Sequence, residues 1–137
     1  MRLAKANAKG FTIVELLIVI VIIGILATIG FVSFSSAQNK AKKSKAQSTV
    51  SQVKSKLGEY YVDNENYPDD KDAVVTYLNA NGGTSTATEF NGSTNYTYAA
   101  SPSGCDNSTT DCTGYTLTAA KAYWNGGASD SDITVTP

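Results

Sequence analysis

The chain has 137 residues and a net charge of −1, which allows one small domain plus an anchor. It has no histidine, no glycine-rich phosphate loop and no Cys/His cluster with metal-ligand spacing, so the sequence predicts that the protein is not an enzyme. Residues 40–56 hold six lysines and no acid, whereas eleven acids and two lysines follow from Glu59 onward. An acidic C-terminal part disfavours direct nucleic-acid binding, which needs cations to displace counterions from phosphate.

An apolar run covers residues 11–34 and carries a single charged residue, Glu15. About 20 apolar residues suffice to cross the hydrocarbon core of a bilayer, so the run predicts a membrane-spanning helix. A carboxylate inside such a span costs roughly 2–3 kcal/mol, which predicts a partner for Glu15. Cleavage after Gly10 would create an α-amine at Phe11, one helical turn from that carboxylate.

Two stretches at the N-terminus form a distinctive pattern, residues 10–20 (GFTIVELLIVI) and residues 24–27 (GILA). Together they resemble the processing and assembly segment of type IV pilins and pseudopilins. The resemblance implies that Met1–Gly10 is a class III leader, which a prepilin peptidase removes by cleaving after Gly10. It also implies that Phe11 becomes the N-methylated first residue, and that Glu15 pairs with the N-terminal amine of an adjacent subunit during filament assembly.

Other interpretations of this segment remain. A secretory signal peptide also joins a basic start to an apolar core, but that core usually has 7–15 residues. A plain single-span anchor fits the length and leaves Glu15 unexplained. The family often has a proline where this chain has Val32. Local melting of the helix in a filament would therefore depend on Gly24 and Gly30, which weaken a helix by about 1 kcal/mol each.

The helical period continues beyond the apolar run. Apolar side chains recur there at spacings of three and four: Ala46, Val50, Val53 and Leu57. This pattern predicts one helix from Phe11 to about Val62, apolar on all faces in residues 11–36 and amphipathic in residues 37–62. Its lysines either contact anionic lipid headgroups or the acidic heads of neighbouring subunits, or are simply solvated.

Charge does not settle the orientation in the membrane, because three basic residues precede the span and four follow it within residues 40–45. The family resemblance places the N-terminus in the cytoplasm, and a cysteine pair beyond the span suits an exported compartment. We therefore expect a single-pass precursor in the cytoplasmic membrane that later joins an extracellular, cell-surface filament.

Residues 63–137 are predicted to form a small globular head. Asn and Asp residues before Pro68 end the long helix, since the residue before a proline is pushed out of helical conformation. A short helix is expected around Ala73–Leu78, capped by the Asp69-Asp70 pair and ended by the glycines at 82 and 83.

Residues 84–136 are predicted to be β-structure. Alternation of β-branched and aromatic residues indicates strands at residues 95–99, 114–119 and 132–136. The predicted fold class is α+β, with a long N-terminal α-helix that packs its apolar stripe against a small antiparallel sheet.

Cys105 and Cys112 are the only cysteines and lie in a loop rich in Gly, Asn, Ser and Thr. Such a pair predicts a structural disulfide, worth roughly 2–3 kcal/mol for a loop of about eight residues. A metal site or a redox dithiol is the alternative, but the six intervening residues fit no CxxC pattern.

Asp130 and Asp132 offer carboxylate oxygens, the ligands that Ca²⁺ prefers. Major pseudopilins of type II secretion bind calcium in a C-terminal loop, and this segment is loosely similar to it. The spacing is not specific, so a solvated acidic turn is the preferred interpretation and no cofactor is expected.

The sequence thus predicts four segments: a leader (1–10), a transmembrane and assembly half-helix (11–36), an amphipathic half-helix (37–62) and a β head (63–137). The predicted function is that of a structural subunit, a major pilin, of a type IV-class surface filament that serves adhesion, motility or DNA uptake. The alternatives are a major pseudopilin of a type II secretion-like system, a minor pilin, and a membrane-anchored binding protein that never polymerises.

The resemblance also implies the partners. They are further copies of the chain in a helical filament, the prepilin peptidase and methylase, the membrane before assembly, and an inner-membrane platform driven by an ATPase. Glu15 favours a body subunit over a tip subunit, because tip relatives often lack this acid.

Overall fold

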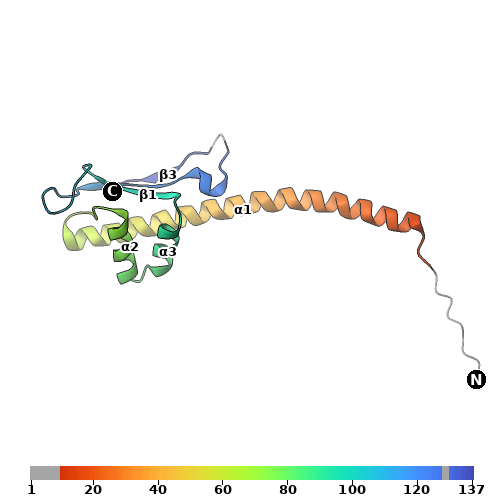
Figure 1. Cartoon of the computed structure of the whole chain (residues 1–137), viewed down its shortest axis with the longest axis horizontal. Helices are drawn as coiled ribbons and strands as arrows, with labels where there is room; N and C mark the ends of the chain where they lie inside the picture. The colour runs from red at the N-terminus through yellow and green to blue at the C-terminus, as the bar shows by residue number, and fades with distance from the viewer. Residues whose placement is uncertain (1–9, 128–129) are drawn as a thin grey trace, which may run out of the picture. The chain divides into compact units, whose positions relative to one another are not determined.

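The structure is a computed structural model that describes residues 10–127 and 130–137. The chain divides into two compact units, Met1–Ala37 and Gln38–Pro137. The elements follow in the order α1 (Ile13–Asn64), α2 (Lys71–Ala80), α3 (Thr84–Gly92), β1 (Tyr96–Ser101), β2 (Gly114–Ala119), the 3₁₀ helix η1 (Lys121–Trp124) and β3 (Ile133–Val135) (Figure 1). The predicted α+β fold class is confirmed.

Helix α1 is one unbroken helix of 52 residues, close to the predicted bounds. The residues around its C-terminal end explain where the helix ends. Glu65 takes a positive φ of 60° and its N–H donates to the carbonyl of Tyr61 at 2.8 Å, while the Asn64 side chain donates to the carbonyl of Tyr60. A left-handed residue just after the last turn ends a helix, and Pro68 prevents its continuation.

Helix α2 confirms the predicted short helix. The N–H of Ala73 donates to the carboxylate of its N-cap, Asp70, at 2.7 Å. At the other end Gly82 takes a φ of +76°, and the N–H of Gly83 donates to the carbonyl of Leu78 at 2.8 Å. This bond and the left-handed glycine form a Schellman ending, which satisfies carbonyls that the helix itself leaves unpaired.

Helix α3 corrects the prediction, because residues 84–92 are helical and not β-structure. The segment TSTATEFNG is rich in threonine, which favours strands. Thr86, Ala87 and Phe90 are nevertheless buried, at spacings that only a helix places on one face. Tertiary burial of this face therefore overrides the local preference.

The sheet is antiparallel in the order β1-β2-β3, so β1 and β3 are its two edges. Tyr98 pairs with Leu117, and Leu117 pairs with Val135. The N–H of Ala120 donates to the carbonyl of Asn95, so the backbone groups of the next residue, Tyr96, point away from β2. The Lys71 ammonium donates to that outward carbonyl at 3.0 Å. The edge of β1 is thus partly covered, and β3 has only three residues.

The core of the unit Gln38–Pro137 lies between α1, the sheet and the two short helices. The predicted stripe of α1 is buried in full: Ala46, Val50, Val53 and Leu57. Its neighbours in the core come from α2, α3, β1, β2 and η1: Val74, Leu78, Ala87, Phe90, Tyr96, Tyr115, Leu117, Ala119 and Trp124. The only tryptophan of the chain is 2 % exposed and therefore belongs to this core.

Candidate functional site

The N-terminal part of α1 presents its apolar side chains on all sides. Within the described residues of Met1–Ala37 the large hydrophobic side chains are at least half exposed, and Phe11 is 92 % exposed. Among the described helices one is long and apolar enough to cross a membrane, and its most apolar window has a mean hydropathy of 3.0. Because an exposed apolar surface of this size is unfavourable in water, this segment needs lipid or other protein around it.

Thr12 and Glu15 form a reciprocal cap at the first turn of α1. The Glu15 N–H donates to the Thr12 hydroxyl at 3.2 Å, and the Thr12 N–H and hydroxyl both donate to Glu15 Oε2, at 2.9 and 2.8 Å. This is the capping box, in which an N-cap hydroxyl and an acid three residues later satisfy each other's backbone donors. Sequence reasoning assigned Glu15 to assembly alone and missed this contact, although the spacing T-x-x-E predicts it.

The cap leaves half of the carboxylate available. Both Thr12 contacts go to Oε2, and Oε1 accepts no hydrogen bond from any described residue. A carboxylate in the first helical turn is also favoured by the helix dipole. Glu15 is therefore held in one position by its own chain, and Oε1 keeps no described partner. Phe11 precedes this turn, and residues 1–9 of the predicted leader lie outside the described residues.

Four of the six lysines in residues 40–56 have a partner within the unit Gln38–Pro137. Lys43 pairs with Asp130, Lys45 with Glu89 and Lys56 with Glu59, with N–O distances of 2.5 to 2.6 Å. Lys54 donates to the carbonyl of Thr136 at 2.8 Å. The Tyr123 hydroxyl also donates to Glu89, and the two donors lower the pKa of that carboxyl although its partial burial opposes them.

The aspartates proposed for calcium do not fit a metal ion. Asp130 accepts from the Lys43 ammonium at 2.5 Å and from the Gly127 N–H at 3.3 Å, and Asp132 accepts from the Lys121 N–H at 2.8 Å. The contact with Lys43 lowers the pKa of Asp130. No group of three or more His, Cys, Asp or Glu side chains among the described residues could hold a metal ion. At Asp130 a lysine already supplies the positive charge that a cation would bring.

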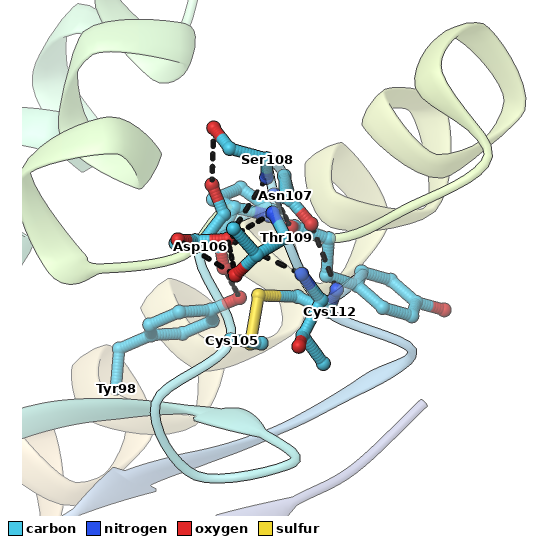
Figure 2. Close-up of a disulfide and its surroundings, with 10 residues drawn as sticks. Tyr98, Cys105, Asp106, Asn107, Ser108, Thr109 and Cys112 are labelled. Atoms are coloured by element: carbon cyan, nitrogen blue, oxygen red, sulfur yellow. Dashed lines mark hydrogen bonds between the residues drawn. A yellow bond between two sulfur atoms is a disulfide. The ribbon is translucent and has the colours of Figure 1, made fainter.

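A disulfide joins Cys105 to Cys112, and the loop between them is ordered by side chains (Figure 2). The Asp106 carboxylate accepts the N–H groups of Ser108 and Thr109 at 2.9 and 2.7 Å, which lowers its pKa to about 2. Asn107 accepts from the Cys112 N–H and donates to the carbonyl of Tyr67, both at 2.7 Å. The loop is therefore fastened to the segment that follows α1.

Comparison with known families agrees with these features. The chain matches the prokaryotic N-terminal methylation motif over residues 5–31. It also matches the model for type II secretion system (T2SS) protein G over residues 33–104, and this second match covers slightly more than half of the chain. No curated protein and no solved structure matches the chain.

The N-terminal motif and the apolar helix define a type IV pilin or pseudopilin. Within that class, the chain belongs to the type II secretion system protein G family. It is thus a structural, non-enzymatic subunit of a type IV filament or of a type II secretion system, made as a membrane-anchored precursor. The protein G match ends at residue 104, before both cysteines, β2, β3 and Asp130.

Proposed function

We propose that the chain is the major subunit of a type IV-class surface filament, assembled through residues 11–36. The bonding of Glu15 carries the proposal. This acid lies at the start of an exposed apolar helix, one oxygen is held by Thr12, and the other is free of described partners. In a bilayer a carboxylate without a counter-charge is costly, so pairing with an amine of a neighbouring copy stabilises the assembled form.

Processing supplies that amine in this proposal. Met1–Gly10 is the leader, cleavage follows Gly10, and Phe11 becomes the N-methylated first residue. The intact mass of fibres sheared from cells should begin at N-methyl-Phe11 and be two hydrogens short because of the Cys105–Cys112 disulfide. An uncleaved chain in cells that have the peptidase would contradict the proposal.

Glu15→Gln separates the two roles of this side chain. Glutamine also serves in a capping box, so the variant keeps the helix start and loses only the charge. We expect the variant to accumulate in the membrane at the wild-type level and to form roughly tenfold fewer filaments or less, as counted by electron microscopy.

Thr12→Ala is the matched control, because it weakens the cap and keeps the carboxylate. This variant should still assemble. If Glu15→Gln assembles normally and Thr12→Ala does not, Glu15 acts only as a cap and the proposed assembly role is wrong.

The second candidate is a major pseudopilin that acts in secretion, which the match over residues 33–104 favours. Two observations distinguish the candidates. Long fibres on wild-type cells, with loss of adhesion, motility or DNA uptake on deletion of the gene, support a pilin. Processed protein that stays in the envelope without fibres, together with loss of exported proteins on deletion, supports a pseudopilin. A few copies per fibre would instead identify a minor pilin.

A further inference from the structure

Two lysines at the beginning of the unit Gln38–Pro137 have no partner in the described part of the chain. Lys40 and Lys42 are exposed and form no salt bridge or hydrogen bond with any described residue. The other lysines of this unit all have a partner among the described residues: Lys43, Lys45, Lys54, Lys56, Lys71 and Lys121. No acid lies between Glu15 and Glu59 in the sequence, so neighbours along α1 do not offset the charge of the two lysines.

The two lysines point in different directions. A helix turns by about 100° per residue, so Lys40 and Lys42, which lie two positions apart in α1, point about 200° away from each other. A protein neighbour that packs on one side of the helix reaches one of these side chains and not the other. A membrane surface surrounds a helix that emerges from it, and it therefore reaches both. The directions of the two charges thus favour a bilayer over a single protein neighbour.

Both lysines follow the apolar part of α1 closely. This part, residues 13–34, is about 33 Å long at about 1.5 Å per residue, which matches the hydrocarbon core of a bilayer, about 30 Å. Lys40 and Lys42 come six and eight residues after Phe34, which is about 9 and 12 Å in a helix. The headgroup layer on each side is about 5–8 Å thick, and a long lysine side chain can bend back toward it. Both ammonium groups can therefore come within one Debye length, about 8–10 Å, of the headgroup phosphates.

We propose that, in the membrane-anchored precursor, Lys40 and Lys42 bind the anionic headgroups of the lipids that surround α1 where it leaves the bilayer. The phosphate of an anionic lipid supplies the negative charge that no described residue supplies to these lysines. A lysine ammonium suits such a mobile partner, because it binds phosphate as a point charge. The proposal goes beyond the filament role, since it concerns the single subunit in the membrane.

The lipid preference of the full-length protein tests the proposal. The protein is reconstituted at low salt into phosphatidylcholine vesicles that contain spin-labelled phosphatidylglycerol or spin-labelled phosphatidylcholine. Electron paramagnetic resonance then gives the association constant of each labelled lipid with the protein. We expect phosphatidylglycerol to associate about twofold or more strongly, and high salt to reduce this ratio, because salt screens exposed charges.

Substitution of the two lysines isolates their contribution. Lys40→Gln with Lys42→Gln should lower the ratio of the two association constants by roughly a third or more, since the basic residues of the leader still contribute. The leader is the same in every variant, so the difference between variants reports on these two lysines. Lys40→Arg with Lys42→Arg keeps the charge and should keep the ratio.

Lys54→Gln with Lys56→Gln is the matched control. It removes two lysines with the same spacing from the same helix. These positions follow the apolar part by about 30 Å, well beyond the Debye length, so the control should leave the ratio unchanged.

Three results would overturn the proposal. An unchanged ratio in the Lys40→Gln, Lys42→Gln variant would show that the two lysines do not select anionic lipid. An equal decrease in the control would show that only the net charge of the chain matters. An unchanged ratio together with the loss of sheared filaments from cells that express the Lys40→Gln, Lys42→Gln variant would assign the lysines to acids of neighbouring copies.

Discussion

Asp106 is a single exposed carboxylate that orders the loop between the two cysteines. It accepts the backbone N–H groups of Ser108, Thr109 and Thr110, and it accepts the Thr109 hydroxyl as well. These bonds favour the ionised form, which explains why the pKa is lowered from 3.8 to about 2. The charge thus fixes the loop that connects β1 to β2.

A pH titration tests this role. Because the pKa of Asp106 is depressed in the folded state, its contribution to stability is present above about pH 4 and is lost as the pH falls through about 2. We expect Asp106→Ala to lower the melting temperature at pH 6, and the difference from wild type to shrink as the pH falls through about 2. Asp111→Ala, which removes an exposed carboxylate of the same loop, is the matched control for the substitution itself. A difference for Asp106→Ala that does not vary with pH would contradict this account.

At the scale of secondary structure, the sequence predicts those elements whose signals are local. The 3.6-residue stripe of α1, the Asp70 cap of α2 and the alternation in the strands are all confirmed, with shifts of one or two residues at the boundaries. Helix α3 and the turn η1 are missed, because their positions depend on burial of Phe90 and Trp124 in a core made by distant segments. Local preference carries no information on such contacts.

Replacing two glycines, one inside α1 and one at the end of α2, by alanine should change the free energy of unfolding in opposite directions. Gly82 ends α2 at a φ of +76°, which a Cβ disfavours, whereas Gly58 lies inside α1 with open space around its Cα. We expect Gly82→Ala to lower the free energy of unfolding by about 1 kcal/mol and Gly58→Ala to raise it by a similar amount.

Trp124 fluorescence during thermal unfolding of the full-length protein in detergent provides the measurement, since this buried side chain is the only tryptophan. Equal effects of both substitutions would show that the end of α2 does not depend on the left-handed glycine.

At the scale of the whole molecule, the C-terminal segment is fastened to α1 by lysines. Asp130 pairs with Lys43, and the carbonyl of Thr136 accepts from Lys54. The sequence predicts the charges involved, but it does not predict which lysine meets which acid, because 87 residues separate Lys43 from Asp130. In the candidate site, too, the sequence predicts some features and the fold is needed for others. The family resemblance predicts an assembly role for Glu15, while its bond to Thr12 and the contact of Lys43 with Asp130 follow from the fold.

The lysine contacts lead to a prediction on divalent cations. The melting temperature of the full-length protein should not change on addition of Ca²⁺ or of a chelator, because the Lys43 ammonium already pairs with the Asp130 carboxylate. Lys43→Ala should destabilise the head by about 1 kcal/mol or less, as expected for a partly exposed ion pair. Lys42→Ala, which removes a lysine without a described partner, should leave the stability of the dispersed subunit unchanged. A large increase of the wild-type melting temperature on addition of Ca²⁺ would show that calcium binds the protein. It would refute the expectation that the Lys43–Asp130 pair prevents binding, and it would favour a pseudopilin.

The protected edges of the sheet have a consequence for a protein that must be crowded against copies of itself. An open strand recruits strands from other molecules, and fibres made in that way are nearly irreversible. Here β3 offers only three residues and Lys71 covers the outward carbonyl of Tyr96 on β1. Both features disfavour strand exchange between heads, so in the proposed filament we expect the contacts between copies to be made by the helices. A polymer joined only through helices can release its subunits intact and take them up again.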